Sequence, residues 1–259
     1  MKLSIRRGSD LVRMLAVGAA LTVAPTRVRA DLFFDASGIH AETGNRISAQ
    51  AIFTLLPDDV LQIVLTNTSP DPEAIRRGDI LTGIVWDIAG ENPRLSGLTV
   101  SRGTSDLYVA RNTIDNQIPL NGRWTFRGAS SGPYAYANDS ASFEYGVSAI
   151  GGGVFGGVRG DDYGLVADAA SLDNPSFTRS AFPLLVGSAT FGLSGFTADL
   201  ASITNVRFTF GAGPSHVLAA GRGVQGAAVP EPSAVVLVAA GLATIGGIAL
   251  CRRRRLAPD

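Results

Sequence analysis

One serine in this sequence has the glycine spacing of a catalytic nucleophile, and a histidine follows later in the chain. Gly128, Ser130 and Gly132 have the G-x-S-x-G spacing of a nucleophile elbow, and His216 follows as a base. That motif requires a strand, a sharp turn and a helix. Pro133 and a stretch rich in Tyr, Asn and Ser follow instead. A serine hydrolase built on Ser130 is therefore kept only as a remote alternative, and we predict no catalytic residue.

Aspartates are the residues that could bind a metal ion. The two histidines and one cysteine form no cluster with the ligand spacing of a zinc site. Asp58 and Asp59 are adjacent, as are Asp161 and Asp162, with Asp168 close behind. Oxygen-rich loops of this kind can hold calcium, but the same residues commonly bond the backbone of exposed turns. We predict no cofactor and no metal site, with calcium kept as an alternative.

Two tyrosines suggest a second kind of site. Tyr134 and Tyr136 lie in the segment "SSGPYAYANDS", which has the composition of a loop. Aromatic rings in a loop can stack on sugars, although in strands they more often pack in the core. Together with the loop carboxylates Asp161 and Asp162, they define a speculative ligand site for a carbohydrate-binding protein, with or without calcium.

The tripeptide Arg-Gly-Asp occurs at 77–79 and again at 159–161. It can act in adhesion, but we interpret both copies as polar turns. The two histidines, His40 and His216, likewise lie in polar stretches flanked by Gly or Ala.

In the segments that must position these residues, apolar side chains recur at every second position. Ala51, Phe53 and Leu55 alternate with other residues before a Pro57-Asp58-Asp59 turn, and alternation resumes after it at 61, 63 and 65. Two such runs around a turn predict a β-hairpin. Similar short runs are "ILTGIVWDI", "GLTVSRG", "DLYVARN", "RWTFRG", "SFEYGVSAI", "ATFGLSGF" and "ITNVRFTFG".

This pattern predicts an all-β fold. Many short strands separated by turn signals are typical of an antiparallel β-sandwich or jelly roll, and one domain over residues 31–225 is within the size range of that class. We expect no helix of more than two turns outside the terminal segments.

The charge of the middle of the chain argues against nucleic acid as a partner. Residues 31–229 contain 12 arginines and no lysine against 19 acidic residues, a net charge of −7. An acidic surface favours solubility and repels phosphates, which need basic partners.

The N-terminal segment has the pattern of an export signal. Lys2, Arg6 and Arg7 form a positive region, and the apolar run "MLAVGAALTVA" follows at 14–24. Val28 and Ala30 then provide compact residues at the positions that a signal peptidase reads. We predict a signal peptide over residues 1–30, cleaved after Ala30.

The C-terminal segment has the pattern of a membrane stop. Residues 234–251 form an uncharged run of 18 residues. As a helix this run is about 27 Å long, close to the roughly 30 Å of the hydrocarbon core. Four arginines follow at once: Arg252, Arg253, Arg254 and Arg255. The positive-inside rule keeps them in the cytoplasm and leaves the preceding domain outside.

Together, Pro230-Glu231-Pro232, the single span and the arginine cluster resemble the PEP-CTERM sorting signal of bacterial exopolysaccharide-associated surface proteins. The resemblance is confined to about the last 30 residues, within the segment 226–259. It implies that the tail is recognised by an exosortase, a membrane-embedded transpeptidase, and cut near the triplet. Pro230, Glu231 and Pro232 are then substrate residues. Because proline restricts its own and the preceding residue's backbone, the triplet should be extended.

These features predict a non-enzymatic protein of the bacterial envelope or extracellular matrix, associated with exopolysaccharide or biofilm. We expect it to be held in the inner membrane with its N-terminal side outside, and to reach the cell surface or matrix after processing.

Overall fold

The computed structural model describes residues 31–71, 76–90, 93–110, 113–129, 134–136, 139–149, 162–173, 183–211, 218–220 and 222–225. Their secondary structure consists of β-strands and three short 3-10 turns, η2 (Arg77–Asp79), η5 (Ala169–Asp173) and η7 (Leu200–Ser202), with no α-helix among them. The all-β class predicted from the sequence is confirmed.

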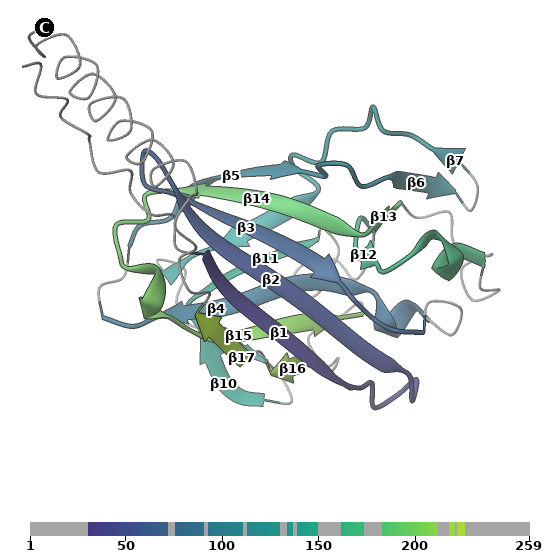
Figure 1. Ribbon diagram of the computed structural model, residues 1–259, viewed down its shortest axis with the longest axis horizontal. Helices are drawn as coiled ribbons and strands as arrows, with labels where there is room; N and C mark the ends of the chain where they lie inside the picture. Colours follow the sequence, from purple (N-terminus) through teal and green to yellow (C-terminus); the bar gives the residue numbers. More distant parts are fainter. Residues whose placement is uncertain are drawn as a thin grey trace, which may run out of the picture.

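One sheet contains six antiparallel strands, which lie at the front in Figure 1. Their order is β17 (Arg222–Gln225), β1 (Asp31–Ile39), β2 (Arg46–Leu56), β3 (Val60–Asn67), β14 (Ser188–Ser194) and β5 (Ser96–Ser101). The first strand of the described chain therefore pairs with the last.

The second sheet contains nine strands. Seven follow the order β16 (Leu218–Ala220), β15 (Ile203–Phe210), β4 (Leu81–Ile88), β12 (Leu165–Val166), β13 (Leu184–Val186), β6 (Leu107–Ala110) and β7 (Thr113–Ile114). The other two are β11 (Tyr145–Ala149), which pairs with β4, and β8 (Trp124–Arg127), which pairs with β11. A separate ribbon pairs β9 (Tyr134–Tyr136) with β10 (Asp139–Phe143).

The predicted hairpin is β2–β3. Phe53 on β2 lies opposite Ile63 on β3, and both side chains are fully buried. The turn contains Asp58 and Asp59, whose φ angles of 62° and 55° lie in the left-handed region that Asp tolerates better than most residues. The Asp59 carbonyl accepts hydrogen bonds from the backbone N–H groups of Gly195 and Phe196. This aspartate pair therefore serves the turn, and alternation in sequence correctly marked the strands.

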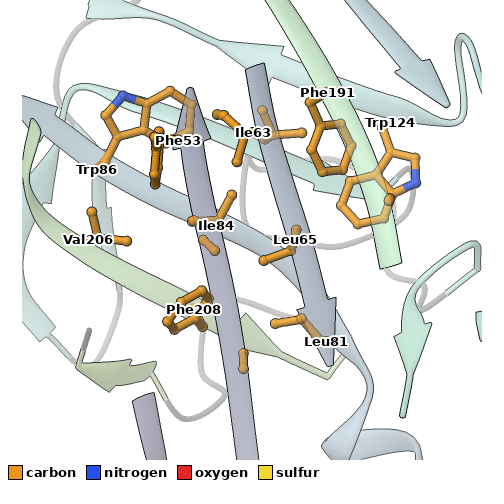
Figure 2. Close-up of a cluster of buried hydrophobic side chains, with 14 of the residues drawn as sticks. Phe53, Ile63, Leu65, Leu81, Ile84, Trp86, Trp124, Phe191, Val206 and Phe208 are labelled. Atoms are coloured by element: carbon orange, nitrogen blue, oxygen red, sulfur yellow. The ribbon is translucent and has the colours of Figure 1, made fainter. Parts of the chain in front are cut away.

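The hydrophobic core lies between the two sheets, which form a curled half-barrel around it. Figure 2 shows side chains from both sheets meeting there. Phe53 of the first sheet contacts Trp86 of the second edge to face, with ring centroids 5.7 Å apart. Trp124 of the second sheet packs on Phe191 of the first at 4.8 Å. Offset and edge-to-face aromatic contacts add to the free energy gained from burying the rings.

Strand β4 is central, and seven of its eight residues are buried. It lies between β15 and β11, and Gly83 allows them to approach closely. A Cβ atom at Gly83 would lie 2.6 Å from the Val147 carbonyl oxygen and 2.8 Å from Thr209 Oγ1. The glycine that interrupts "ILTGIVWDI" is therefore required by strand packing.

Candidate functional site

The two ends of the described domain lie side by side. β1 begins at Asp31, the residue after the expected signal cleavage, and Leu32 lies opposite Gln225, the last residue of β17. The expected sorting segment starts at residue 226. Both predicted membrane-directed segments therefore leave the domain from the same end of one sheet.

The C-terminal strands also join the two sheets. β16 pairs with β15 in the second sheet, and β17 pairs with β1 in the first, although only residue 221 separates β16 from β17. The last residues of the domain thus connect the sheets along one edge.

The tip of the β1–β2 hairpin lies at the opposite end of the first sheet. From Asp31 to Ile39 the strand extends about 26 Å at a rise of about 3.3 Å per residue. The tip closes through hydrogen bonds from His40 N to the Asn45 carbonyl, 2.9 Å, and from Gly44 N to the His40 carbonyl, 2.8 Å.

Asp79 connects this tip to the η2 turn. Its side chain is fully buried and accepts three hydrogen bonds. The donors are Thr43 Oγ1 at 2.5 Å, Asn45 Nδ2 at 2.6 Å and the backbone N–H of Arg76 at 2.8 Å. A buried carboxylate is tolerated when donors satisfy its oxygens. The 77–79 tripeptide forms a turn as expected, but its aspartate faces inward and is inaccessible to a partner.

His40 is buried beside the same turn. Its Nδ1 accepts from the backbone N–H groups of Glu42 and Thr43, at 3.3 and 3.2 Å, so the neutral ring carries its hydrogen on Nε2. A Cβ at Gly78 would lie 3.0 Å from the His40 ring. Asp79 therefore cross-links two loops through hydrogen bonds, and the His40 ring lies against Gly78 of the second loop, roles that the polar composition around them did not reveal.

A surface hollow of about 390 Å³ lies at the hairpin tip. It is lined by Ser37, Gly38, Ile39, Arg46, Ile47, Ser48 and Pro70. Ile39 is 67% exposed, and Ile114 is the other exposed large hydrophobic residue among those described. At the rim, Arg46 Nε and Nη2 each donate to an Asp71 carboxylate oxygen at 3.0 Å. This hydrogen-bonded pair raises the pKa of Arg46.

The tyrosine site predicted from the sequence lies partly within the described chain. Tyr134 and Tyr136 belong to strand β9, whereas their composition had suggested a loop. Asp162 is half-buried in a turn. Asp168 is exposed, and its Oδ1 accepts from the backbone N–H of Ala170 at 2.8 Å, as in an ordinary Asx turn.

Several predicted residues lie outside the described residues, and their predictions stand as made. They are the signal segment 1–30 with Ala30, Ser130, Gly132 and His216, the 159–161 tripeptide with Asp161, the triplet Pro230, Glu231 and Pro232, the span 234–251, and Arg252, Arg253, Arg254 and Arg255.

Within the described ranges, no group of three or more His, Cys, Asp or Glu side chains could hold a metal ion. No helix in the described part of the chain is long and apolar enough to cross a membrane. Comparisons with protein families, curated proteins and solved structures find no match to this chain.

Proposed function

We propose that this protein is a non-enzymatic component of the bacterial envelope or extracellular matrix, a β-sandwich domain exported by its signal peptide and processed at its tail by an exosortase. The observation that carries this proposal is the order of Pro-Glu-Pro, apolar span and arginine cluster in residues 230–255. The pairing of β1 with β17 supports it, because it places both ends of the domain at the same end of the first sheet. Segments that precede and follow the domain can then both reach a membrane on that side.

The finer description as a sandwich rests on the core. Rings from the two sheets pack against each other at 4.8 and 5.7 Å, as in face-to-face sheet packing. We infer a partly closed sandwich, and the joined edge at β16 and β17 supports the partial closure.

Intact-mass analysis tests the processing. Full-length protein and a Glu231→Ala variant are produced in the native host and in a strain without exosortase. We expect a shortened product, ending near residue 230, only from the unmodified chain in the native host. Ser233→Ala, directly beside the triplet, is the matched control and should be processed normally. Finding only species that end at Asp259 in all strains would rule the processing out.

Carbohydrate binding is a second candidate, which the hollow at the hairpin tip favours. Ser37 offers a hydroxyl group, Ile39 and Pro70 offer apolar surface, and Arg46 offers a guanidinium at the rim. Sugars are bound by this mixture of polar groups and apolar faces.

A glycan array probed with the purified exported protein tests this candidate. We expect binding that Arg46→Ala or Ile39→Asp weakens at least about tenfold, a loss of about 1.4 kcal/mol. Tyr134→Ala and added EDTA test the alternative site at Tyr134, Tyr136, Asp161 and Asp162. An array without any signal would leave the domain with a structural role.

A further inference from the structure

The first sheet has an outer face, which points away from the core. Residues at alternate positions of its strands, such as Phe53, Ile63 and Phe191, are buried between the two sheets. Because successive side chains of a strand point to opposite sides, the residues between them lie on the outer face. Figure 1 shows this sheet at the front, with the second sheet behind it.

Val64 on β3 lies in the middle of the outer face. Ile52 on β2 and Thr190 on β14 lie directly opposite it on its two sides. Gln62 and Thr66 lie two residues away along β3 itself. An apolar side chain is thus surrounded by an apolar neighbour and three polar, uncharged ones.

Two further residues extend this group toward β1. Phe33 lies opposite Ile52, and Gln50 lies opposite Thr66. We call the group the outer patch; it consists of Phe33, Gln50, Ile52, Gln62, Val64, Thr66 and Thr190, all half-buried. With strands about 4.8 Å apart and a rise of about 3.3 Å per residue, it covers about 14 Å across the strands and about 13 Å along them.

The strands around the outer patch are almost free of charge. β3, β14 and β5 contain no Asp, Glu, Lys or Arg at any position, and on β2 only Arg46, its first residue, is charged. The chain between residues 31 and 229 is nevertheless acidic overall. An uncharged surface offers no ion pairs to a charged partner, and the acidic domain repels an anionic polymer.

The polar groups of the outer patch are open to a ligand. Among the described residues, the side chains of Gln50, Gln62, Thr66 and Thr190 form no hydrogen bond to another residue. Thr54, opposite Gln62 on the same face, differs, because its hydroxyl donates to Asp31 Oδ1 at 2.7 Å. Amide and hydroxyl side chains can both donate and accept hydrogen bonds.

A neutral polysaccharide has the chemistry that fits this arrangement. A sugar ring presents C–H groups on its two faces and hydroxyl groups around its edge. The apolar row of Phe33, Ile52 and Val64 can pack on the C–H groups, while the amides and hydroxyls beside it can bond the sugar hydroxyls. Protein partners are mostly held by Trp, Tyr and Arg side chains, and the outer patch contains none of these.

The outer patch continues into the hollow at the hairpin tip. Ser48 lines the hollow and lies on the same side of β2 as Gln50, two residues away. Ser37, which also lines the hollow, lies opposite Ser48 on β1. From Arg46 at the rim to Ile52 the strand covers about 20 Å. A chain of several sugar units is therefore long enough to contact the hollow and the outer patch together.

We propose that the outer patch and the hollow form one extended binding face for a neutral polysaccharide chain. The outer patch contacts successive units of the chain, and the hollow takes one end of it. β2 and β3 are paired on both sides and packed on the core, so the face is formed before the ligand binds. This proposal rests on carbohydrate binding, the second candidate function, and adds the class of sugar and the surface that holds it.

Affinity electrophoresis of the purified exported protein tests the proposal. Native gels contain dextran, galactomannan or hydroxyethyl cellulose as neutral probes, and alginate as the anionic probe. We expect at least one neutral probe to retard the protein and alginate to leave its mobility unchanged. Retardation by alginate alone, or by no probe, would overturn the proposal. A protein that binds short sugars on the glycan array but no polymer would keep the candidate function and lose only the extended face.

Two isosteric variants locate the binding on the outer patch. Gln62→Glu replaces an amide donor by a charge, and Thr190→Val removes a hydroxyl but keeps a β-branched side chain. Each should weaken binding to the retarding probe about three- to tenfold. The matched controls are Gln117→Glu, in the turn after β7, and Thr125→Val, on β8, both at exposed positions of segments outside the first sheet. Unchanged binding in the two patch variants would overturn the proposal.

Thermal unfolding of the same variants separates lost contacts from misfolding. The patch variants and their controls should keep nearly the Tm of the unmodified protein, because none of the four changes removes a buried group. A second copy of the chain is the other occupant that an uncharged sheet face could accept. Sedimentation velocity measures this, and self-association that Gln62→Glu abolishes, without retardation by a neutral probe, would assign the outer patch to a dimer instead.

Discussion

The hydroxyl oxygen of Thr43 lies 2.5 Å from a carboxylate oxygen of Asp79, and this contact joins the tip of the first hairpin to the turn that precedes β4. Asn45 donates to the other carboxylate oxygen of Asp79 at 2.6 Å. The carboxylate is fully buried, and these donors offset the free-energy cost of burying it.

Asp79→Ala should therefore lower the free energy of unfolding by about 2–4 kcal/mol, because Thr43, Asn45 and the Arg76 amide all lose their acceptor. Urea unfolding of the purified protein measures the change. Asp168→Ala is the control: this exposed aspartate makes one local hydrogen bond, and its loss should cost less than about 1 kcal/mol. Equal effects of the two variants would contradict the cross-linking role of Asp79.

Gly83→Ala should destabilise the protein by about 2–4 kcal/mol. The new Cβ would meet the Val147 carbonyl oxygen at 2.6 Å, and a backbone atom in a central strand cannot move aside easily. Gly38→Ala offers the comparison, since a Cβ there has no neighbour within 4 Å. Thermal unfolding should show a lower Tm for the first variant and a nearly unchanged Tm for the second.

Asn67→Ala should cost about 2–3 kcal/mol. Asn67 is buried at the end of β3, where its Nδ2 donates to the Leu165 carbonyl at 2.8 Å and its Oδ1 accepts from Ser69 N at 3.0 Å. The side chain thus links the first sheet to β12 of the second, and its removal leaves two buried groups without partners. The neighbouring Thr68 is exposed, and Thr68→Ala should change stability by less than about 0.5 kcal/mol in the same unfolding measurement.

Alkaline pH should destabilise the protein through Tyr145. Burial, and secondarily the negative charge of Glu144, raise the pKa of this phenol to about 12. In the unfolded chain the phenol titrates near pH 10. Between these values the unfolded state binds fewer protons than the folded state, so stability falls as the pH rises, by at most about 1.4 kcal/mol per pH unit.

Tyr145→Phe isolates this effect. The hydroxyl donates to the buried Pro93 carbonyl at 3.0 Å, so the variant should lose about 1 kcal/mol at neutral pH. Its stability should then fall less steeply than that of the unmodified protein above pH 10. Unfolding curves at pH 8, 10 and 11 compare the two, and parallel curves would contradict the assignment to Tyr145.

Local patterns were sufficient for the strands whose two faces differ. Phe53 and Ile63 are buried at alternate positions of β2 and β3, and the Asp58-Asp59 turn between them could be predicted because its conformation depends on adjacent residues. The run "ILTGIVWDI", predicted as a similar short strand, forms β4, although nearly all of its residues are buried.

Contacts between distant segments could not be predicted in the same way. His40 and Asp79 lie in polar stretches, and only the folded chain brings their loops together and buries them. The pairing of β1 with β17 joins residues separated by most of the domain. No local pattern in either strand indicates with which other strand it pairs. Tyr134 was placed in a loop because glycine, proline and serine precede it, yet β10 pairs with that segment.

Under the proposed export, the order of strands has a consequence for translocation across the membrane. The N-terminal strand would enter the periplasm first, and its outer edge would stay uncovered until the C-terminal strand arrives, because β17 is its neighbour on that side. During this interval the edge of β1 is open to pairing with other chains. We therefore expect the nascent protein to need protection by a periplasmic chaperone until residue 225 has crossed, and the completion of translocation, rather than local hairpin formation, to set when the domain becomes resistant to aggregation.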